Sequence, residues 1–185
     1  MKLLALACLL LPLSAPAWDK PVSGYAYLPE QIQAMQDDDF ENPGMYTVEE
    51  GHALFHAPGY NGRSCAGCHG VNGSRLDPQA IARYPVYSAA RKGPLTLQQR
   101  INDCREHQLD EFPLTYDDAE LIALETYVRH LARGERVNVE VEGPLEPWYD
   151  SGKALYHTRI GQFDMGCHHC HDRYVDLRLR DQVLN

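Results

Sequence analysis

The sequence predicts a mainly helical protein with one complete domain followed by the start of a second copy. The chain has 185 residues, 44% of them hydrophobic, which suffices for one or two domains with a buried core. A short block that begins at Gly51 returns at Gly152. Apolar residues at helical spacing follow polar caps in the first copy, which favours helices over strands.

The repeat consists of a six-residue block and a cysteine pair. Residues 51–56 read GHALFH, and residues 152–157 read GKALYH. Each block precedes a Cys-x-x-Cys-His motif, and the glycine lies 14 residues before the first cysteine in one copy and 15 in the other. Two matching features at nearly the same offset indicate a duplicated domain.

Three helices are expected in the first copy, each opened by a polar cap. Thr47 begins a capping box for a helix that runs through Phe55, and Thr96 begins the second helix. The third is expected to open within residues 115–118 and to end at Gly134. The first copy is therefore predicted as short helices around a loop that contains cysteines.

The other segments are expected to be irregular. Residues 58–73 and 77–93 are predicted as loops, and valines that alternate with polar residues over 137–142 predict an extended linker or an edge strand. About fifty residues of the first copy have no counterpart after Gly152, so the second domain is expected to be incomplete. The expected divisions are a leader at 1–17, an N-terminal extension at 18–46, a first domain at 47–134, a linker at 135–146 and the start of a second domain at 147–185.

The N-terminus has the organisation of a secretory signal peptide. Lys2 precedes an apolar run at 3–11, and residues 15–17 are small enough for a cleavage site. The run is shorter than the ~20 apolar residues that span a bilayer, and no later stretch approaches that length. A lipoprotein signal that ends at Cys8 is the alternative, although few apolar residues precede it. We therefore expect a periplasmic protein without a membrane span, which keeps five of its six cysteines.

The charge of the chain excludes one class of partner. Asp and Glu number 26 against 17 Lys and Arg, so the formal net charge is −9. A nucleic-acid-binding protein needs a basic face, and none is expected here. A basic protein or a cationic patch is the more suitable partner.

Two Cys-x-x-Cys-His motifs carry the chemical signal. They consist of Cys65, Cys68 and His69, and of Cys167, Cys170 and His171. Thiols three residues apart lie on one side of a helical turn, where they can add to the two vinyl groups of one haem. The adjoining histidine then presents its imidazole to the iron. The sequence therefore predicts two covalently attached haems c.

Other uses of the four cysteines explain less of the sequence. A zinc site with four Cys ligands would combine pairs from separate repeats and give neither histidine a role. A redox dithiol of the thioredoxin kind needs a strand–helix context, whereas Gly-rich loops flank these motifs. Disulfides across a two-residue gap are sterically poor, and disulfides alone cannot use five thiols.

The second axial ligand of the first haem is expected to be sulfur. Small cytochromes commonly use a methionine downstream of the attachment motif, but none lies between His69 and Gly134. The candidates are Cys104, His107 and His130. Cys104 is the odd thiol and is favoured, with a buried inert thiol as its alternative role. His130 is expected to interact with the end of its own helix, and His107 remains an alternative ligand.

Residues around these ligands have secondary roles. Arg100 lies one helical turn before Cys104 and could neutralise a thiolate or a haem propionate, or stay solvated. An anionic thiolate would stabilise ferric iron, so a low reduction potential is expected for the first haem. The spacer residues His168 and His169 are expected to be exposed and structurally optional.

The sequence resembles the SoxA family, the A subunit of the thiosulfate-oxidising Sox system, in its dihaem form. The resemblance extends from about Ser23 to the end of the sequence. The segments that carry it are AMQDDDFENPGM at 34–45, SCAGCHG at 64–70, ARYP at 82–85, RINDCR at 100–105 and CHHCHD at 167–172. The first and fourth are the most specific, because Cys-x-x-Cys-His alone identifies only a cytochrome.

The resemblance implies fold, activity and partners. It implies tandem domains like class I cytochromes c and an enzyme of the L-cysteine S-thiosulfotransferase type. Such subunits pair with a small monohaem cytochrome, SoxX, couple thiosulfate oxidatively to a cysteine of the carrier SoxYZ, and pass the electrons to a cytochrome. A dihaem electron carrier without thiosulfate chemistry, a dihaem peroxidase and a non-catalytic haem-bearing subunit are the alternatives.

The resemblance also implies site residues. His69 and Cys104 would be the axial ligands of the first haem, and the haem attached at Cys167 and Cys170 would be the active-site haem. The family's catalytic cysteine and arginine lie later in the second domain, and no cysteine follows Cys170. Both are therefore expected beyond Asn185, the last residue of the sequence. No catalytic residue is expected within this chain, which by itself is expected to be inactive.

Overall fold

Helices make up most of the part of the chain that the computed structural model describes, which is residues 23–175, 177–179 and 182–184. The predicted leader at 1–17, with Cys8, lies outside the described residues, and so does Asn185. The helices are η1 (Gly24–Tyr27), α1 (Glu30–Asp37), α2 (Gly44–His56), α3 (Cys65–His69), η2 (Val71–Gly73), α4 (Pro78–Ile81), α5 (Leu97–Leu109), α6 (Ala119–His130), η3 (Gly143–Leu145), α7 (Glu146–His157) and η4 (His169–Arg173).

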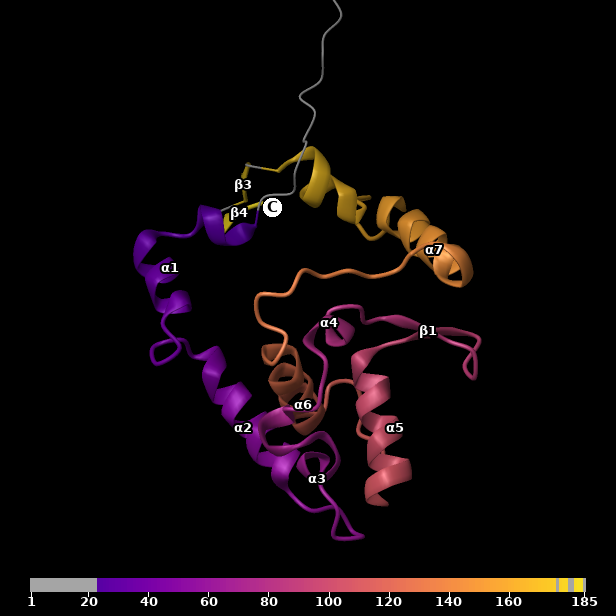
Figure 1. The fold of residues 1–185 in the computed structure, drawn as a ribbon. Coiled ribbons are helices and arrows are strands. Elements are labelled where there is room, and N and C mark those ends of the chain that lie inside the picture. The colour runs from indigo at the N-terminus through magenta and orange to yellow at the C-terminus, as the bar shows by residue number, and fades with distance from the viewer. Residues whose placement is uncertain (1–22, 176, 180–181, 185) are drawn as a thin grey trace, which may run out of the picture.

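Two short antiparallel hairpins accompany the helices. In the first copy, β1 (Val86–Ser88) pairs with β2 (Gly93–Leu95). Near the C-terminal end, β3 (Arg178–Leu179) pairs with β4 (Gln182–Val183). Both hairpins are short and lie at the periphery of the helices (Figure 1). The fold is therefore mainly α, as predicted.

The core of the first copy forms where α2 crosses α6. The two helices approach so closely at Gly51 that a Cβ atom there would collide with the Ala123 carbonyl and lie 2.7 Å from the Tyr127 Cβ. Phe55, 2% exposed, packs beside this crossing with Leu124. The glycine is therefore required for close approach, and the crossing positions the helices that enclose the candidate site.

The first residues of the helices show which capping signals in the sequence predicted a helix start correctly. α5 begins with the predicted capping box, in which the Thr96 hydroxyl accepts a hydrogen bond from the Gln99 amide at 3.2 Å. The start at Thr47 was wrong, because the Asn42 side chain accepts from the Gly44 amide at 2.9 Å and opens α2 earlier. α6 begins after Asp118, the last residue of the predicted cap segment.

The predicted loops contain more structure than expected. Residues 58–73 include α3, capped by Ser64, and residues 77–93 include α4, capped by Asp77. No strand forms over 137–142 in the described chain, so the extended-linker alternative holds. Within the described ranges, no helix has both the length and the apolar composition needed to cross a bilayer.

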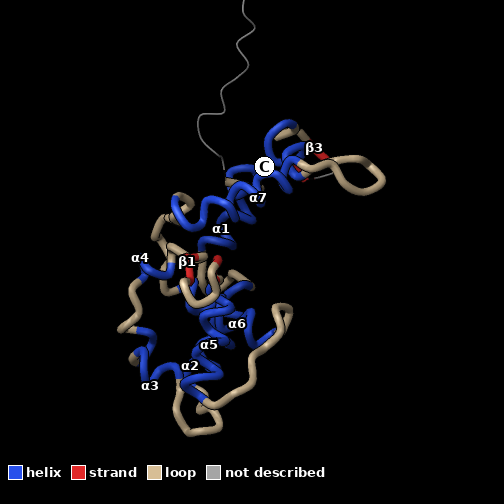
Figure 2. The backbone as a smooth tube through the Cα atoms, turned by 90° about the vertical axis from the view of Figure 1, so that its right-hand side faces the viewer, coloured by secondary structure: helices blue, strands red, loops and turns tan. Residues whose placement is uncertain are grey.

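The two copies of the repeat lie apart. Figure 1 and Figure 2 both place α3 at the end of the molecule opposite the C-terminal segment that follows α7. The linker carries the chain from α6 to α7, and Trp148 at the start of α7 packs against β2, since a Cβ at Gly93 would lie 3.0 Å from its ring.

Candidate functional site

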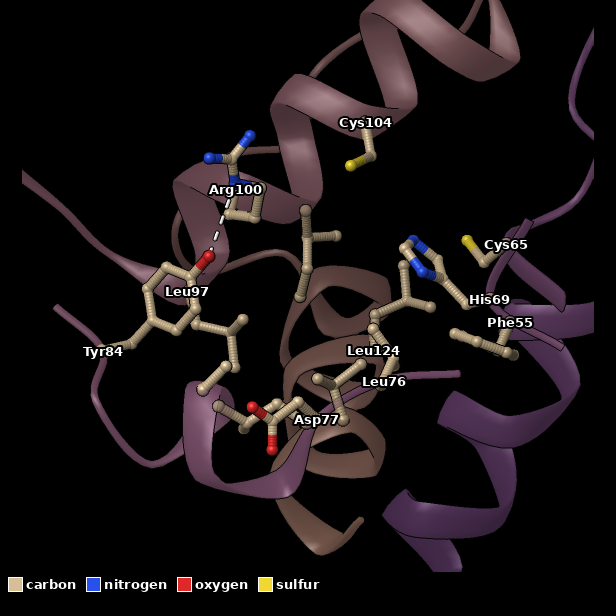
Figure 3. Close-up of a pocket in the computed structure, with 14 residues that line it drawn as sticks. Phe55, Cys65, His69, Leu76, Asp77, Tyr84, Leu97, Arg100, Cys104 and Leu124 are labelled. Carbon is tan, nitrogen blue, oxygen red and sulfur yellow. Dashed lines mark hydrogen bonds between the residues drawn. The ribbon is translucent and has the colours of Figure 1, made fainter. Parts of the chain in front are cut away.

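The first copy encloses a cavity of about 380 Å³. Its volume lies within the range of about 300–1,000 Å³ that is typical of cofactor sites. Helices α2 to α6 all contribute to its wall, which is mostly apolar (Figure 3). The lining residues are Phe55, Cys65, His69, Leu76, Asp77, Ala80, Ile81, Tyr84, Leu97, Arg100, Ile101, Cys104, Leu124 and Val128.

The first Cys-x-x-Cys-His motif forms the short helix α3. The Ser64 hydroxyl caps this helix by accepting a hydrogen bond from the Gly67 amide at 3.2 Å. Cys65 and His69 line the cavity, whereas the Cys68 side chain is exposed and accepts a hydrogen bond from Arg63 at 3.4 Å. The helical turn therefore holds Cys65 and His69 in the wall of the cavity and leaves Cys68 outside it.

Burial keeps the His69 imidazole in the form that can bind a metal. Desolvation lowers its pKa, so the ring is neutral near pH 7 and one nitrogen has a free lone pair. The ring lies 6.3 Å, centroid to centroid, from Phe55, which helps to fix its position.

Cys104 reaches the same cavity from α5. Figure 3 shows Cys104 on α5 across the cavity from His69 and Cys65, and all three residues line it. Burial raises the pKa of the Cys104 thiol, while the Arg100 guanidinium opposes that rise. Burial also raises the pKa of Cys65 to about 11. Without a metal cation both groups are thiols at neutral pH, and coordination would deprotonate Cys104.

The two histidine alternatives lie elsewhere. His107 lines a separate outer groove, and its Nδ1 donates to the Asp103 carbonyl at 2.9 Å. His130 borders a hollow between α2 and α6 that also includes His52. Of the three candidates, only Cys104 lines the cavity that contains His69.

These residues fit a haem of the c type. Imidazole and sulfur donors reach one cavity from different helices, a cysteine for attachment lies beside them, and the remaining walls are apolar. Sequence reasoning missed Tyr84 and Asp77 as wall residues. Tyr84 lies in the ARYP segment at 82–85, which carries the family resemblance, whereas the only signal for Asp77 was its place in a segment expected to be a loop.

The second motif is arranged differently. Cys167 and His171 are exposed and Cys170 is half-buried, around the single π-helical turn η4. His169 is 6% exposed and its Nδ1 accepts a hydrogen bond from the Gly166 amide at 3.0 Å. The expectation of an exposed His169 was therefore wrong, because the chain folds back at Gly166 and covers the ring.

The four-cysteine alternative is inconsistent with this arrangement. The first cysteine pair belongs to α3, which both views place at the opposite end of the molecule from the C-terminal segment after α7, where the sequence puts the second pair (Figures 1 and 2). A single zinc ion cannot contact both pairs, since each Zn–S bond is about 2.3 Å long.

Comparison with known proteins agrees with the site. A family model described as SoxA/TsdA, cytochrome c domain, matches residues 50–137. Curated SoxA subunits of L-cysteine S-thiosulfotransferase from Rhodovulum sulfidophilum and Pseudaminobacter salicylatoxidans are 34% and 32% identical to this chain, over 92% and 91% of its length. The crystal structure of SoxXA from P. pantotrophus matches 88% of this chain at 27% identity, with a TM-score of 0.78.

The matches cover only part of the length of each relative. This chain spans 60% and 59% of the two curated relatives and 61% of the matched crystal chain. The predicted resemblance and the cytochrome c-like fold are confirmed, and a cytochrome c domain implies haem c. The catalytic residues that are expected beyond Asn185 lie outside the described residues, so their position stays a prediction.

Proposed function

Because this chain is a SoxA-like protein with a cytochrome c domain, we propose that it serves as a haem-bearing subunit in the oxidative coupling of thiosulfate to a carrier-protein cysteine. The observation that carries the proposal is the presence of His69 and Cys104 in one apolar cavity. A sulfur ligand in place of methionine favours a low potential, which suits an acceptor of electrons from a sulfur anion.

Two haems c are proposed. Cys65 and Cys68 would attach the first, and His69 and Cys104 would hold its iron. The second would be attached at Cys167 and Cys170 beside His171. Each bound haem would supply one-electron oxidation and reduction at its iron.

The residues of the chain have separable tasks in the first domain. His69 presents a neutral nitrogen because burial lowers its pKa. Cys104 presents sulfur from a helix that is fixed by the Thr96 capping box. Phe55 and the other apolar side chains exclude water, which strengthens electrostatic interactions inside the cavity.

The proposed reaction joins two sulfur atoms. The carrier thiol loses its proton, a bond forms between its sulfur and the outer sulfur of thiosulfate, and two electrons leave. The product is a carrier Cys–S–S–SO₃⁻, and a cytochrome acceptor takes the electrons in single steps. Two copies of a one-electron centre in one subunit suit this stoichiometry.

The proposed partners follow from the relatives. The matched crystal structure is of SoxXA, which supports a complex with a SoxX-like monohaem cytochrome. The name of the curated relatives, L-cysteine S-thiosulfotransferase, supports a SoxYZ-like carrier as the cysteine donor and thiosulfate as the substrate. The predicted leader at 1–17 supports a periplasmic location, where haem c is attached.

The test uses the full gene product, matured in a host that attaches haem c. With the SoxX-like partner, a carrier and thiosulfate, we expect the carrier to gain the mass of a thiosulfate group while the haems become reduced. A carrier without its cysteine is the control. Haem reduction by other donors, with no mass gain on the intact carrier, would contradict the proposal and identify a plain electron carrier.

A further inference from the structure

The polar side chains of the first-domain cavity wall include two groups on opposite sides. Cys65 and His69 lie at one end and Arg100 and Tyr84 at the other (Figure 3). The wall also includes the carboxyl group of Asp77, and Arg100 is the only arginine or lysine among its described residues. The end with Arg100 is therefore the one suited to an anionic group.

Arg100 and Tyr84 are already joined. The Arg100 Nε donates a hydrogen bond to the Tyr84 hydroxyl at 3.4 Å. That hydroxyl accepts from the arginine, so its own proton remains available for an anion. Both groups can thus donate to the same oxygen-bearing ligand.

Arg100 has a free positive charge. Across the part of the chain that is described, no carboxylate forms an ion pair with it. Asp103 of the same helix is paired with Arg91 instead. A buried or half-buried carboxylate is stable only with such a partner, because its desolvation is costly.

We propose that Arg100 and Tyr84 bind a propionate of the first-domain haem and so orient the ring in its cavity. This inference rests on the proposed haem. In a c-type haem the thioether-bearing rings and the propionate-bearing rings occupy opposite edges of the porphyrin. Attachment beside Cys65 therefore directs the carboxylates toward the far end, where Arg100 and Tyr84 lie.

The rival role for Arg100 is to neutralise the Cys104 thiolate. Cys104 lies one turn further along α5, and the arginine charge does reach it. However, the guanidinium donates its hydrogen bond to Tyr84, which has no role in supporting a thiolate. Binding of a propionate accounts for the positions of both Arg100 and Tyr84, whereas neutralisation of the Cys104 thiolate accounts for Arg100 alone.

The test compares Arg100→Gln and Tyr84→Phe with the parent protein, after mass spectrometry has shown that each carries its haems. Arg136→Gln is the matched control, because it removes the same charge from an exposed residue that does not line the cavity. The readouts are the propionate deformation band in resonance Raman difference spectra and the electron paramagnetic resonance of the ferric first haem. Because the second haem is the same in all samples, its bands cancel in the difference spectra.

We expect the propionate band to shift in Arg100→Gln and, less strongly, in Tyr84→Phe, and to stay unchanged in Arg136→Gln. Arg100→Lys should bring the propionate band part of the way back to its position in the parent protein. The ferric signal that depends on the sulfur ligand should persist in every variant. An unshifted propionate band in haem-loaded Arg100→Gln and Tyr84→Phe would overturn the inference, and an altered sulfur-ligand signal in its place would assign Arg100 to Cys104. A parent protein without haem would instead refute the proposed function.

Discussion

The two copies of the repeat begin with nearly the same helix but differ in what covers it. In the first copy, Gly51 on α2 touches α6 and Phe55 is 2% exposed. In the second, a Cβ at Gly152 on α7 would meet no heavy atom within 4 Å in the described chain, and Tyr156, the counterpart of Phe55, is only half-buried. The block therefore specifies a helix, whereas the cavity depends on a second helix that packs across it.

The cysteine motifs differ in the same way. In the first copy, Ser64 caps an α-helical turn, and α2 and α6 enclose the cavity beside it. In the second, η4 is a π-helical turn whose N-cap residue, His168, makes no side-chain capping hydrogen bond. Identical Cys-x-x-Cys-His spacing thus gives a cavity only where long-range packing encloses it.

The largest difference is expected at the aromatic position of the block. Phe55→Ala should lower the free energy of unfolding by about 4 kcal/mol, because a large side chain leaves a void in the core. The equivalent Tyr156→Ala should cost far less, since Tyr156 is only partly covered and bonds to the exposed Asp172. Urea unfolding followed by circular dichroism measures both losses. Equal losses would show that the two copies bury this position to the same extent.

The glycines provide the next test. Gly51→Ala should cost about 3 kcal/mol, because the new methyl group collides with the α6 backbone and forces the helices apart. Gly152→Ala should be neutral or stabilise α7 by up to about 1 kcal/mol, since alanine favours helix and nothing in the described chain opposes the methyl group. Thermal unfolding of the two variants checks this. A loss at Gly152 as large as at Gly51 would mean that another helix covers α7.

A smaller effect is expected at the cap of the first motif. Ser64→Ala removes the hydroxyl that caps α3 and should cost about 1 kcal/mol. Haem should still attach, because the cysteines and His69 remain. Ser64→Thr, which keeps the hydroxyl, is the control. Identical melting of Ser64→Ala and the parent would show that the cap does not stabilise the motif.

The smallest effect is expected at Tyr127. Its hydroxyl is buried without a hydrogen-bond partner in the described part of the chain. Tyr127→Phe should therefore leave the free energy of unfolding unchanged or raise it by about 1 kcal/mol. A clear loss of stability would reveal a partner for this hydroxyl, and urea unfolding would detect it.

The sequence was sufficient for features with local causes. The Thr96 capping box and the position of Cys104 on its helix depend on neighbours within a few residues, and both were predicted. The extra length of α2 depends on an Asn42 turn, which was overlooked. The burial of His169 and the contribution of Tyr84 to the cavity wall depend on how the chain folds back on itself. No local pattern encodes those contacts, so they required the structure.

The central claim is that sulfur from Cys104 faces the first iron. Electron paramagnetic resonance of the ferric protein, compared between the parent, Cys104→Ala and His107→Ala, tests it directly. We expect a low-spin signal of a thiolate-ligated haem that disappears in Cys104→Ala and persists in His107→Ala. A signal that persists in Cys104→Ala and is lost in His107→Ala would contradict it.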